Sequence, residues 1–249
     1  MQRVEVNVYR VWDRGIRWFH WINLLSVLAL LGTGLVIYNG RDLGIAGDAK
    51  IWLKELHVWA GYIFAVNLAW RIIQGFRGNH FSRWRSILPF SRGYLSELRT
   101  YLLSVRSGES RHYLGHNPLG QLMVLLLFLL LLNQAVTGLV LAGTDIYYPP
   151  LGGWIAQWVA PAGVDPSSLI PGDKTMVDAT AWADMRAFRK PFITLHVQLF
   201  FVLLGAVLLH VAGVVMVEIR DRAGLVSAMI TGDKTLSTPP VDLPGRSGE

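Results

Sequence analysis

Four long apolar runs, separated by polar links, dominate the chain. They cover about residues 18–38, 51–73, 118–143 and 192–217. Each run is long enough to cross a bilayer as a helix, which takes ~20 mostly apolar residues. A backbone exposed to lipid must satisfy its own hydrogen bonds, so only helices and closed barrels span membranes. The pattern therefore predicts an all-α membrane protein built as a four-transmembrane-helix bundle.

The polar links differ in charge, and this difference predicts an orientation. The N-terminal residues 1–17 and the link 74–117 are basic, whereas the link 144–190 is acidic and rich in proline, glycine and tryptophan. Lysine and arginine accumulate in the cytoplasmic loops of membrane proteins. We therefore expect both termini in the cytoplasm and the link 144–190 in the periplasm of a bacterial cytoplasmic (inner) membrane.

The segments outside the apolar runs have their own predicted structure. Residues 92–105 have apolar side chains on one side and predict a short interfacial helix. The link 144–190 is expected to be ordered without long helices. A domain over residues 1–222 is expected to hold all four spans, and the polar, proline-containing residues 223–249 predict a disordered cytoplasmic tail.

Composition narrows the class of protein. The 249 residues are 52% hydrophobic and 16% charged, which is too apolar for an ordinary soluble domain. The chain has no cysteine, which excludes disulfides, zinc–thiolate sites, iron–sulfur clusters and covalently attached haem within it. The net charge of +6 resides in the links between apolar runs, so it fits a membrane surface rather than nucleic acid.

Two histidines lie inside the last apolar run. His196 and His210 are fourteen positions apart, which is nearly four helical turns, so both face one side of the helix. About 21 Å of helix axis separates them, which places one near each edge of a ~30 Å hydrocarbon slab. Intramembrane polar groups are costly and usually functional, although two histidines in helix–helix hydrogen bonds are the simpler alternative.

The other intramembrane histidines match these two in depth. With the predicted orientation, His57 lies at the same outer level as His196, and His20 lies at the same inner level as His210. Imidazole suits iron, so the pairs predict axial ligands of two non-covalent b-type haems. A zinc or copper site would need three or four ligands at one depth. Four unrelated structural histidines remain an alternative, and the link histidines His80, His112 and His116 are interpreted as part of a solvated basic surface.

Weaker candidates surround the predicted haems. Arg17 and Arg71, with Arg14, lie near the inner level and are possible propionate contacts, or simply positive charges that anchor the helix ends at the cytoplasmic side. The tetrapeptide T-G-L-V occurs at 33–36 and again at 137–140, either as a faint internal repeat or as small residues at helix contacts. Intramembrane amides favour helix–helix hydrogen bonds over quinone contact; they are Asn67, Asn133 and Gln134.

Three stretches carry a resemblance to a known family. They are R-W-F-H-W-I-N around His20, E-L-H-V-W-A-G-Y around His57, and the pair His196 and His210. Over about residues 8–222 the chain resembles the b-type cytochrome subunit of membrane-bound nickel–iron hydrogenases, within the bacterial cytochrome b561-like group. Formate dehydrogenase gamma subunits and thiosulfate reductase cytochromes are relatives. The resemblance implies four helices, two b haems, exchange of electrons with membrane quinone, and a periplasmic redox partner.

The predicted function follows from these observations together. We expect an electron-transfer subunit of a quinone-linked respiratory oxidoreductase complex, with no catalytic nucleophile. A free-standing cytochrome b561 that oxidises a small reductant, and a non-redox membrane anchor or small transporter, are the alternatives. The aromatic-rich link 144–190 is expected to dock the electron donor, or else to form a self-packed lid over the outer haem; its aromatic residues are Tyr147, Tyr148, Trp154, Trp158 and Trp182.

Overall fold

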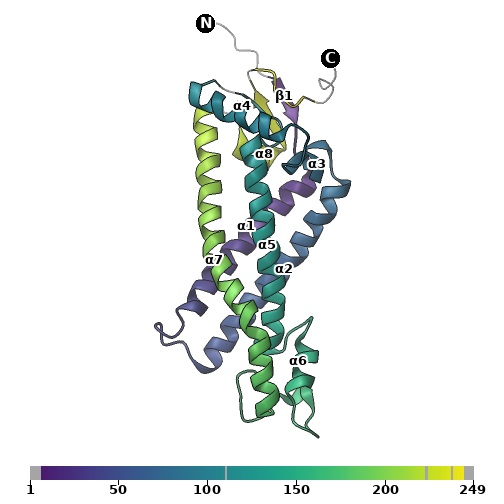
Figure 1. The fold of residues 1–249 in the computed structure, drawn as a ribbon, viewed down its shortest axis with the longest axis vertical. Coiled ribbons are helices and arrows are strands. Elements are labelled where there is room, and N and C mark those ends of the chain that lie inside the picture. The colour runs from purple at the N-terminus through teal and green to yellow at the C-terminus, as the bar shows by residue number, and fades with distance from the viewer. Residues whose placement is uncertain (1–6, 110, 222–223, 237, 244–249) are drawn as a thin grey trace. The chain divides into compact units, whose positions relative to one another are not determined.

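The computed structural model describes residues 7–109, 111–221, 224–236 and 238–243 (Figure 1). Four of its helices are long and apolar enough to cross a membrane, as the sequence predicts. The elements in chain order are β1 (Asn7–Arg10), α1 (Arg14–Tyr38), α2 (Gly47–Arg77), the 3-10 turn η1 (His80–Ser82), α3 (Trp84–Ile87), α4 (Tyr94–Ser107), α5 (Pro118–Ile146), α6 (Gly152–Val159), the 3-10 turn η2 (Pro166–Ser168), α7 (Ala179–Asp221), α8 (Leu225–Thr231) and β2 (Asp233–Leu236).

The long helices present large apolar side chains outward. Val66 is 72% exposed, Leu209 66% and Leu25 66%. A soluble protein rarely leaves so much apolar surface uncovered, whereas lipid tails solvate it. These exposed faces agree with four membrane-spanning helices, α1, α2, α5 and α7.

Two compact units divide the chain. Unit 1 comprises Met1–Trp21, Leu68–Leu129 and Gly205–Glu249, and unit 2 comprises Ile22–Asn67 and Leu130–Leu204. Each of the four long helices contributes one part to each unit. The outer histidines His57 and His196 therefore belong to unit 2, and the inner histidines His20 and His210 belong to unit 1.

Helix α7 is longer than the sequence predicts. The helix begins at Ala179, whereas the sequence predicts the span from about residue 192, so Pro191 lies inside the helix. Asp178 caps the true start, because its Oδ1 accepts a hydrogen bond of 2.8 Å from the backbone N–H of Ala181. At ~1.5 Å per residue the 43 residues measure about 65 Å, more than a membrane requires. The expectation that the link up to Lys190 lacks long helices is thus wrong.

The rest of that link packs on itself within unit 2. Helix α6 and the start of α7 share a small apolar core that contains Ile155, Val159 and Met185, all three fully buried. Figure 1 shows α6 beside the lower parts of α5 and α7. The link is therefore a folded cap with its own hydrophobic cluster.

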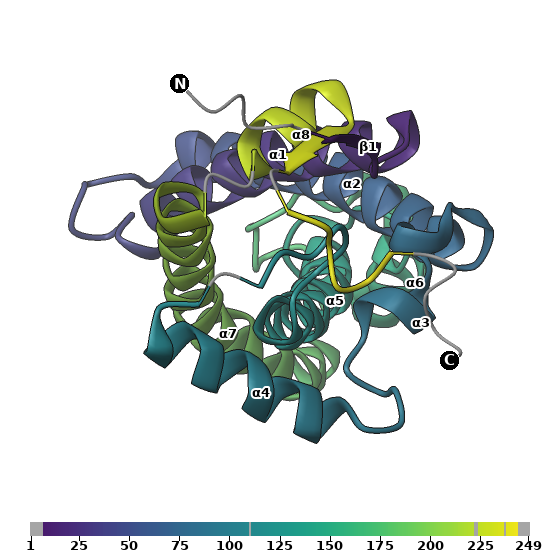
Figure 2. The ribbon, with the colours of Figure 1, turned by 90° about the horizontal axis from the view of Figure 1, so that it is seen from above.

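The C-terminal segment also differs from the prediction of disorder. Helix α8 follows α7, and β2 pairs antiparallel with β1, with Val8 opposite Thr235 and Tyr9 opposite Lys234. A core of buried residues joins these elements to the start of α1; it includes Val11, Trp12, Ile16, Phe81, Leu114, Ala228 and Leu236. Figure 2 shows α8 and β1 close together at one edge of the ribbon. The remaining tail residues 222–223, 237 and 244–249 lie outside the described residues. Beside the helices, the described chain thus contains one two-stranded sheet that the sequence analysis did not predict.

Lys234 connects the C-terminal segment to the basic link 74–117 through hydrogen bonds. Its buried ammonium group donates to the carbonyl oxygens of Tyr113 (3.1 Å), Leu114 (2.7 Å) and Gly115 (3.3 Å). Asp242 accepts hydrogen bonds from the backbone N–H groups of Leu114 and Gly115. A buried charge is tolerated only when its hydrogen-bonding capacity is satisfied, and here three carbonyl groups satisfy it.

The interfacial helix predicted at 92–105 is present as α4. It is held to the start of α5 by two hydrogen bonds: the Tyr94 hydroxyl donates to the carbonyl oxygen of Pro118 (2.7 Å), and Asn117 Nδ2 donates to the Tyr101 hydroxyl (2.9 Å). Leu95, Leu102 and Leu103 remain exposed. The helix therefore keeps an uncovered apolar side, as a helix lying on a membrane surface would.

Candidate functional site

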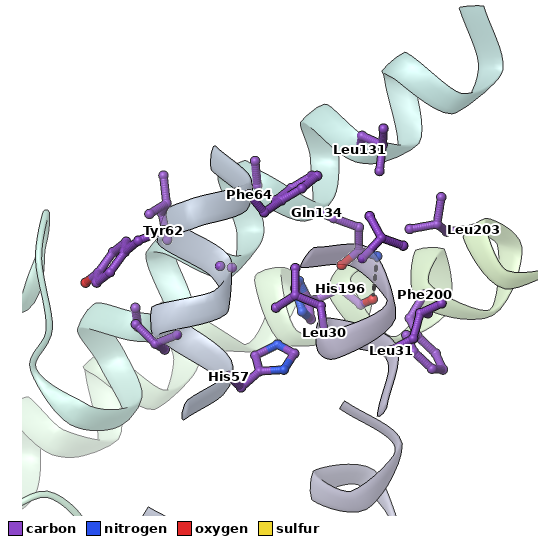
Figure 3. A pocket seen from close by; sticks show the side chains of 17 residues that line it. Leu30, Leu31, His57, Tyr62, Phe64, Leu131, Gln134, His196, Phe200 and Leu203 are labelled. Atoms are coloured by element: carbon purple, nitrogen blue, oxygen red, sulfur yellow. Dashed lines mark hydrogen bonds between the residues drawn. The ribbon is translucent and has the colours of Figure 1, made fainter. Parts of the chain in front are cut away.

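The pocket in unit 2 is lined by all four long helices. It is walled mainly by apolar side chains, with His57 from α2 and His196 from α7 on its surface (Figure 3). Apolar pockets with a few convergent polar groups are the usual sites of small ligands and cofactors. The two histidines predicted as the outer pair therefore share one cavity.

The two imidazole rings are spaced as ligands on opposite sides of one metal ion would be. Their centroids lie 6.3 Å apart, with an angle of 78° between the ring planes. A metal–imidazole bond of about 2 Å on each side of one ion puts two ring centroids about 6 Å apart. The rings are thus close enough to share an ion and too far apart to stack on each other.

Thr33 of α1 orients the His57 ring. Its Oγ1 lies 2.8 Å from His57 Nδ1 and 2.7 Å from the carbonyl oxygen of Ala29. A carbonyl oxygen can only accept, so the single hydroxyl proton is donated to Ala29, and the hydroxyl oxygen accepts from Nδ1–H of the imidazole. In this arrangement Nε2 is the unprotonated nitrogen, and it carries the lone pair that binds a metal.

Thr137 of α5 has the same relation to His196. Its Oγ1 lies 2.8 Å from His196 Nδ1 and 2.6 Å from the carbonyl oxygen of Asn133. The Thr137 hydroxyl donates its proton to Asn133, so its oxygen accepts from Nδ1–H of His196. Nε2 of His196 is then unprotonated and can bind a metal. Gln134, one turn earlier, donates a 3.0 Å hydrogen bond to the backbone carbonyl of His196, which makes it the helix–helix contact that the sequence favours.

An ionic cluster lies in the same unit where α2 begins and α5 ends. Asp145 bonds to Lys54 at 2.7 Å and also pairs with Arg189 of α7 through two nitrogen atoms of its guanidinium group. Nearby, the Tyr148 hydroxyl donates to Glu55 at 3.1 Å. These contacts join three of the helices that line the pocket.

The inner histidines both belong to unit 1. His20 of α1 and His210 of α7 are close enough to interact electrostatically, and the His20 ring packs edge-on against Trp21. The Nδ1 atom of His20 is buried and has no hydrogen-bond partner within the described part of the chain. The inner pair therefore differs from the outer pair, whose Nδ1 atoms both have threonine partners.

Arg71 is a buried cation in the same unit. It is 5% exposed, and its guanidinium group lies over the rings of Trp84 (5.2 Å), Phe128 (5.6 Å) and Phe19 (5.9 Å). Its Nη2 donates to the carbonyl oxygen of Ser82 at 3.0 Å, whereas the buried Nη1 has no partner among the described residues. An unpaired buried guanidinium nitrogen is costly, so this position suits an acidic ligand group.

Four further buried polar atoms in unit 1 have no partner in the described residues: Arg17 Nε, the Tyr113 hydroxyl oxygen, His116 Nδ1 and Gln121 Oε1. Another nitrogen of Arg17 donates to the carbonyl oxygen of Ile230. His116 is partly buried against Trp12, contrary to the prediction of a solvated basic surface. Burial and the nearby cations Lys234 and Arg71 lower the pKa of His116 to about 3, so it is neutral.

Sequence reasoning missed the two threonines. The repeated T-G-L-V contains both of them, at Thr33 and Thr137, and was a usable signal. Each is followed by a glycine that faces the same imidazole: a Cβ on Gly34 would lie 3.5 Å from His57 Cε1, and one on Gly138 would lie 3.4 Å from His196 Cε1. The repeat therefore marks a matched Thr–Gly contact to each outer histidine.

The donor set fits a haem group better than an isolated metal ion. In the described residues no three His, Asp or Glu side chains gather at one point, so the intramembrane histidines group in twos. Two neutral imidazoles across an apolar pocket suit an iron porphyrin, whose remaining iron ligands are its own nitrogens. The buried arginines with open nitrogen atoms suit the propionates of such a group.

Comparison with known proteins agrees with this site. The family model described as prokaryotic cytochrome b561 matches residues 11–232. A protein of Rhizobium leguminosarum bv. viciae, named a probable Ni/Fe-hydrogenase B-type cytochrome subunit, is 30% identical over 94% of this chain and 90% of its own length. Its Bradyrhizobium diazoefficiens counterpart, with the same name, is also 30% identical, over 90% of this chain and 85% of its own.

The match to a third relative covers a smaller share of both chains. The Escherichia coli K12 protein named a probable Ni/Fe-hydrogenase 1 B-type cytochrome subunit is 31% identical over 59% of this chain and 67% of its own length. No solved structure is significantly similar to the chain. The family match covers all four spans and implies haem b and electron transfer: the chain is a membrane cytochrome that belongs to the prokaryotic cytochrome b561 family.

Proposed function

We propose that the chain transfers electrons between a periplasmic redox partner, such as a hydrogenase, and the membrane quinone pool. In this proposal His57 and His196 hold an outer b-type haem, and His20 and His210 hold an inner one. The observation that carries it is the 6.3 Å separation of the His57 and His196 rings across an apolar pocket, with both Nε2 atoms left free by threonine hydrogen bonds.

The protein's own residues have simple tasks in this function. The histidines bind and orient, the apolar walls exclude water, and Arg71 and Arg17 offer unpaired nitrogen atoms to acidic groups of the inner haem. When bound, the haems supply one-electron chemistry by changing the oxidation state of their iron. Two sites that each use a histidine of α7 would let electrons cross the bilayer in steps.

Two observations support the proposed redox partner and the proposed orientation in the membrane. The relatives with a hydrogenase subunit name cover up to 94% of this chain, which favours a hydrogenase as the partner. The basic links at 1–17 and 74–117 favour cytoplasmic termini, which places the folded cap formed by 147–178 in the periplasm. A partner bound to the cap would be close to the outer pair, because Tyr148 of the cap packs edge-on against Trp59, two residues after His57.

Haem content in single-histidine variants tests the proposal. Purified protein should show a reducible b-type spectrum and two haems per chain. His57→Ala and His196→Ala should each retain only the inner haem, and His20→Ala and His210→Ala only the outer one, because each haem needs two protein ligands. His112→Ala serves as the matched control and should retain both haems.

Three outcomes would contradict the proposal. Loss of the same haem from the His20→Ala and His57→Ala variants would show that the pairing is wrong. A spectrum with no reducible b-type band would instead favour a membrane anchor or transporter. Rapid haem reduction by a small reductant together with no exchange of electrons with a hydrogenase would favour the free-standing cytochrome.

A further inference from the structure

We propose that Thr33 and Thr137 are positioning residues that fix the protonation and orientation of the two outer histidines and so hold the outer site at a lower reduction potential than it would otherwise have. This inference rests on the proposed haem ligation by His57 and His196. Neither threonine touches the proposed metal position. Each acts through the imidazole to which it is hydrogen-bonded.

The geometry is the same on both sides of the pocket. Each threonine hydroxyl lies 2.8 Å from the Nδ1 atom of its histidine, and each hydroxyl proton is committed to the carbonyl oxygen four residues earlier, at 2.7 Å for Thr33 and 2.6 Å for Thr137. A hydroxyl whose proton is already donated can only accept from Nδ1–H. Both rings are therefore held as the tautomer whose Nε2 can bind a metal.

The pair Thr–Gly contacts an outer imidazole at two places in the chain. The threonine reaches Nδ1 of the ring, while the glycine that follows faces Cε1 of the same ring at 3.5 Å for Gly34 and 3.4 Å for Gly138, measured from an added Cβ. One helix thus contacts the ring through a hydrogen bond and leaves space beside it. The pattern is carried by α1 toward α2 and again by α5 toward α7, so the two ligands are supported by two different helices in the same way.

A hydrogen bond from Nδ1–H makes the opposite ring nitrogen more basic. A more basic ligand stabilises the oxidised iron more than the reduced iron, because the oxidised iron carries the higher charge. The outer site therefore gains a preference for the oxidised state that the inner site lacks at His20, whose Nδ1 has no partner in the described residues. The threonines give the two sites of one chain different ligand strengths.

The test uses Thr33→Val and Thr137→Val, which keep the shape of the side chain and remove the hydroxyl, and Thr33→Ser and Thr137→Ser, which keep the hydroxyl. Thr194→Val is the matched control: Thr194 also bonds to the carbonyl four residues earlier, is exposed, and lies on α7 near His196. Full-length protein is titrated electrochemically while its visible spectrum is recorded, and the electron paramagnetic resonance signals of the two oxidised haems are measured.

We expect each valine variant to shift the outer midpoint potential to more positive values and to change the outer resonance signal, with the inner haem unchanged. The dissociation constant of the outer haem should rise about 10-fold or more, as is typical when a partner of a metal ligand is lost. Serine variants and Thr194→Val should match the unmodified protein.

Unchanged outer potential and resonance in both valine variants would overturn the inference. So would equal shifts in the serine and valine variants, because the effect would then come from packing. These results are distinct from failure of the haem assignment itself, which would appear as retention of the outer haem in His57→Ala and His196→Ala.

Discussion

Lys54 and Asp145 form an ion pair of 2.7 Å between residues 91 positions apart, one near the start of α2 and the other at the end of α5. Arg189 of α7 donates to both oxygens of the same carboxylate and shares Oδ2 with Lys54. A single acidic group thus neutralises two cations whose side chains are at most a quarter exposed. Three of the four long helices depend on it in unit 2.

Asp145→Asn should therefore destabilise the protein strongly. Removing the one anion leaves two partly buried cations unpaired, a change that typically costs about 3 kcal/mol or more. The measurement is thermal unfolding of detergent-purified protein. The control is Asp233→Asn, which breaks the more exposed Arg10–Asp233 pair and should cost less than about 1 kcal/mol. Equal effects of the two substitutions would contradict this prediction.

Arg71→Leu should lower the midpoint potential of the inner haem and leave that of the outer haem unchanged. A buried positive charge favours the added electron, and Arg71 is 5% exposed with one nitrogen unpaired among the described residues. Redox titration with spectroscopic separation of the two haems measures the shift. Arg77→Leu, at the exposed end of α2, removes the same charge and is expected to change neither potential. A matching shift in both variants would point to overall charge as the cause.

The predicted orientation can be tested because the chain has no cysteine. Ser168→Cys in the cap and Ser91→Cys before α4 introduce single thiols at exposed positions. A membrane-impermeant thiol reagent should label Ser168→Cys in intact cells with an opened outer membrane and Ser91→Cys only after the inner membrane is broken. Labelling of both thiols in intact cells would contradict a four-span topology with cytoplasmic termini.

Trp154 is the best position for testing whether the cap docks the redox partner. It is 55% exposed on α6, whereas Tyr147 and Trp158 pack against the buried cluster of the cap. Trp154→Ala should slow electron exchange with a hydrogenase by about 10-fold, because exposed aromatic side chains supply much of the energy at interfaces. Reduction by a small dye should be unchanged.

Trp158→Ala is the companion variant for the cap. It should loosen the cluster around Ile155 and Val159, so the dye and the hydrogenase should be affected together. If Trp154→Ala also changed both reactions equally, the cap would act as a lid over the outer site and not as a docking surface.

Because the Lys234 amine is buried, we expect the stability of the β1–β2 sheet to depend on pH. Burial lowers its pKa to about 8, against about 10.4 in an unfolded chain. Between these values the unfolded segment binds more protons than the folded one, so stability should rise as pH increases from about 8 to about 10.4. Hydrogen exchange of the β1 and β2 amides, corrected for intrinsic rates, measures this. Lys234→Met should abolish the dependence, and an unchanged profile in that variant would contradict the assignment.

Hydrophobic run length and charge predicted the four helices, because lipid leaves few alternatives for such runs. Matching depth in the orientation inferred from the charges also predicted that His57 and His196 would be neighbours. The repeated T-G-L-V marked Thr33 and Thr137, but it did not show that they contact the histidines, since these hydrogen bonds depend on the rotation of one helix against the next. The start of α7 was misjudged at Pro191, because Asp178 and the helix-favouring residues after it outweigh one proline.

The C-terminal segment was missed for a different reason. β2 has only four residues, D-K-T-L, and its partner β1 lies more than 220 positions earlier. A local sequence pattern cannot predict a pairing between two strands that lie so far apart in the chain. The burial of Leu236 and of the aliphatic part of Lys234 depends on Trp12 and Leu114, which the sequence places in separate segments.

The pairing of β1 with β2 also sets the order in which the molecule is completed during synthesis. Asn7–Arg10 is made before the four long helices, and Asp233–Leu236 is made after all of them. The first strand therefore has no partner until the four long helices have been made, and pairing the two strands is a later step with a long loop to close. A chain truncated before Asp233 would contain every histidine yet leave the strand Asn7–Arg10 without its partner.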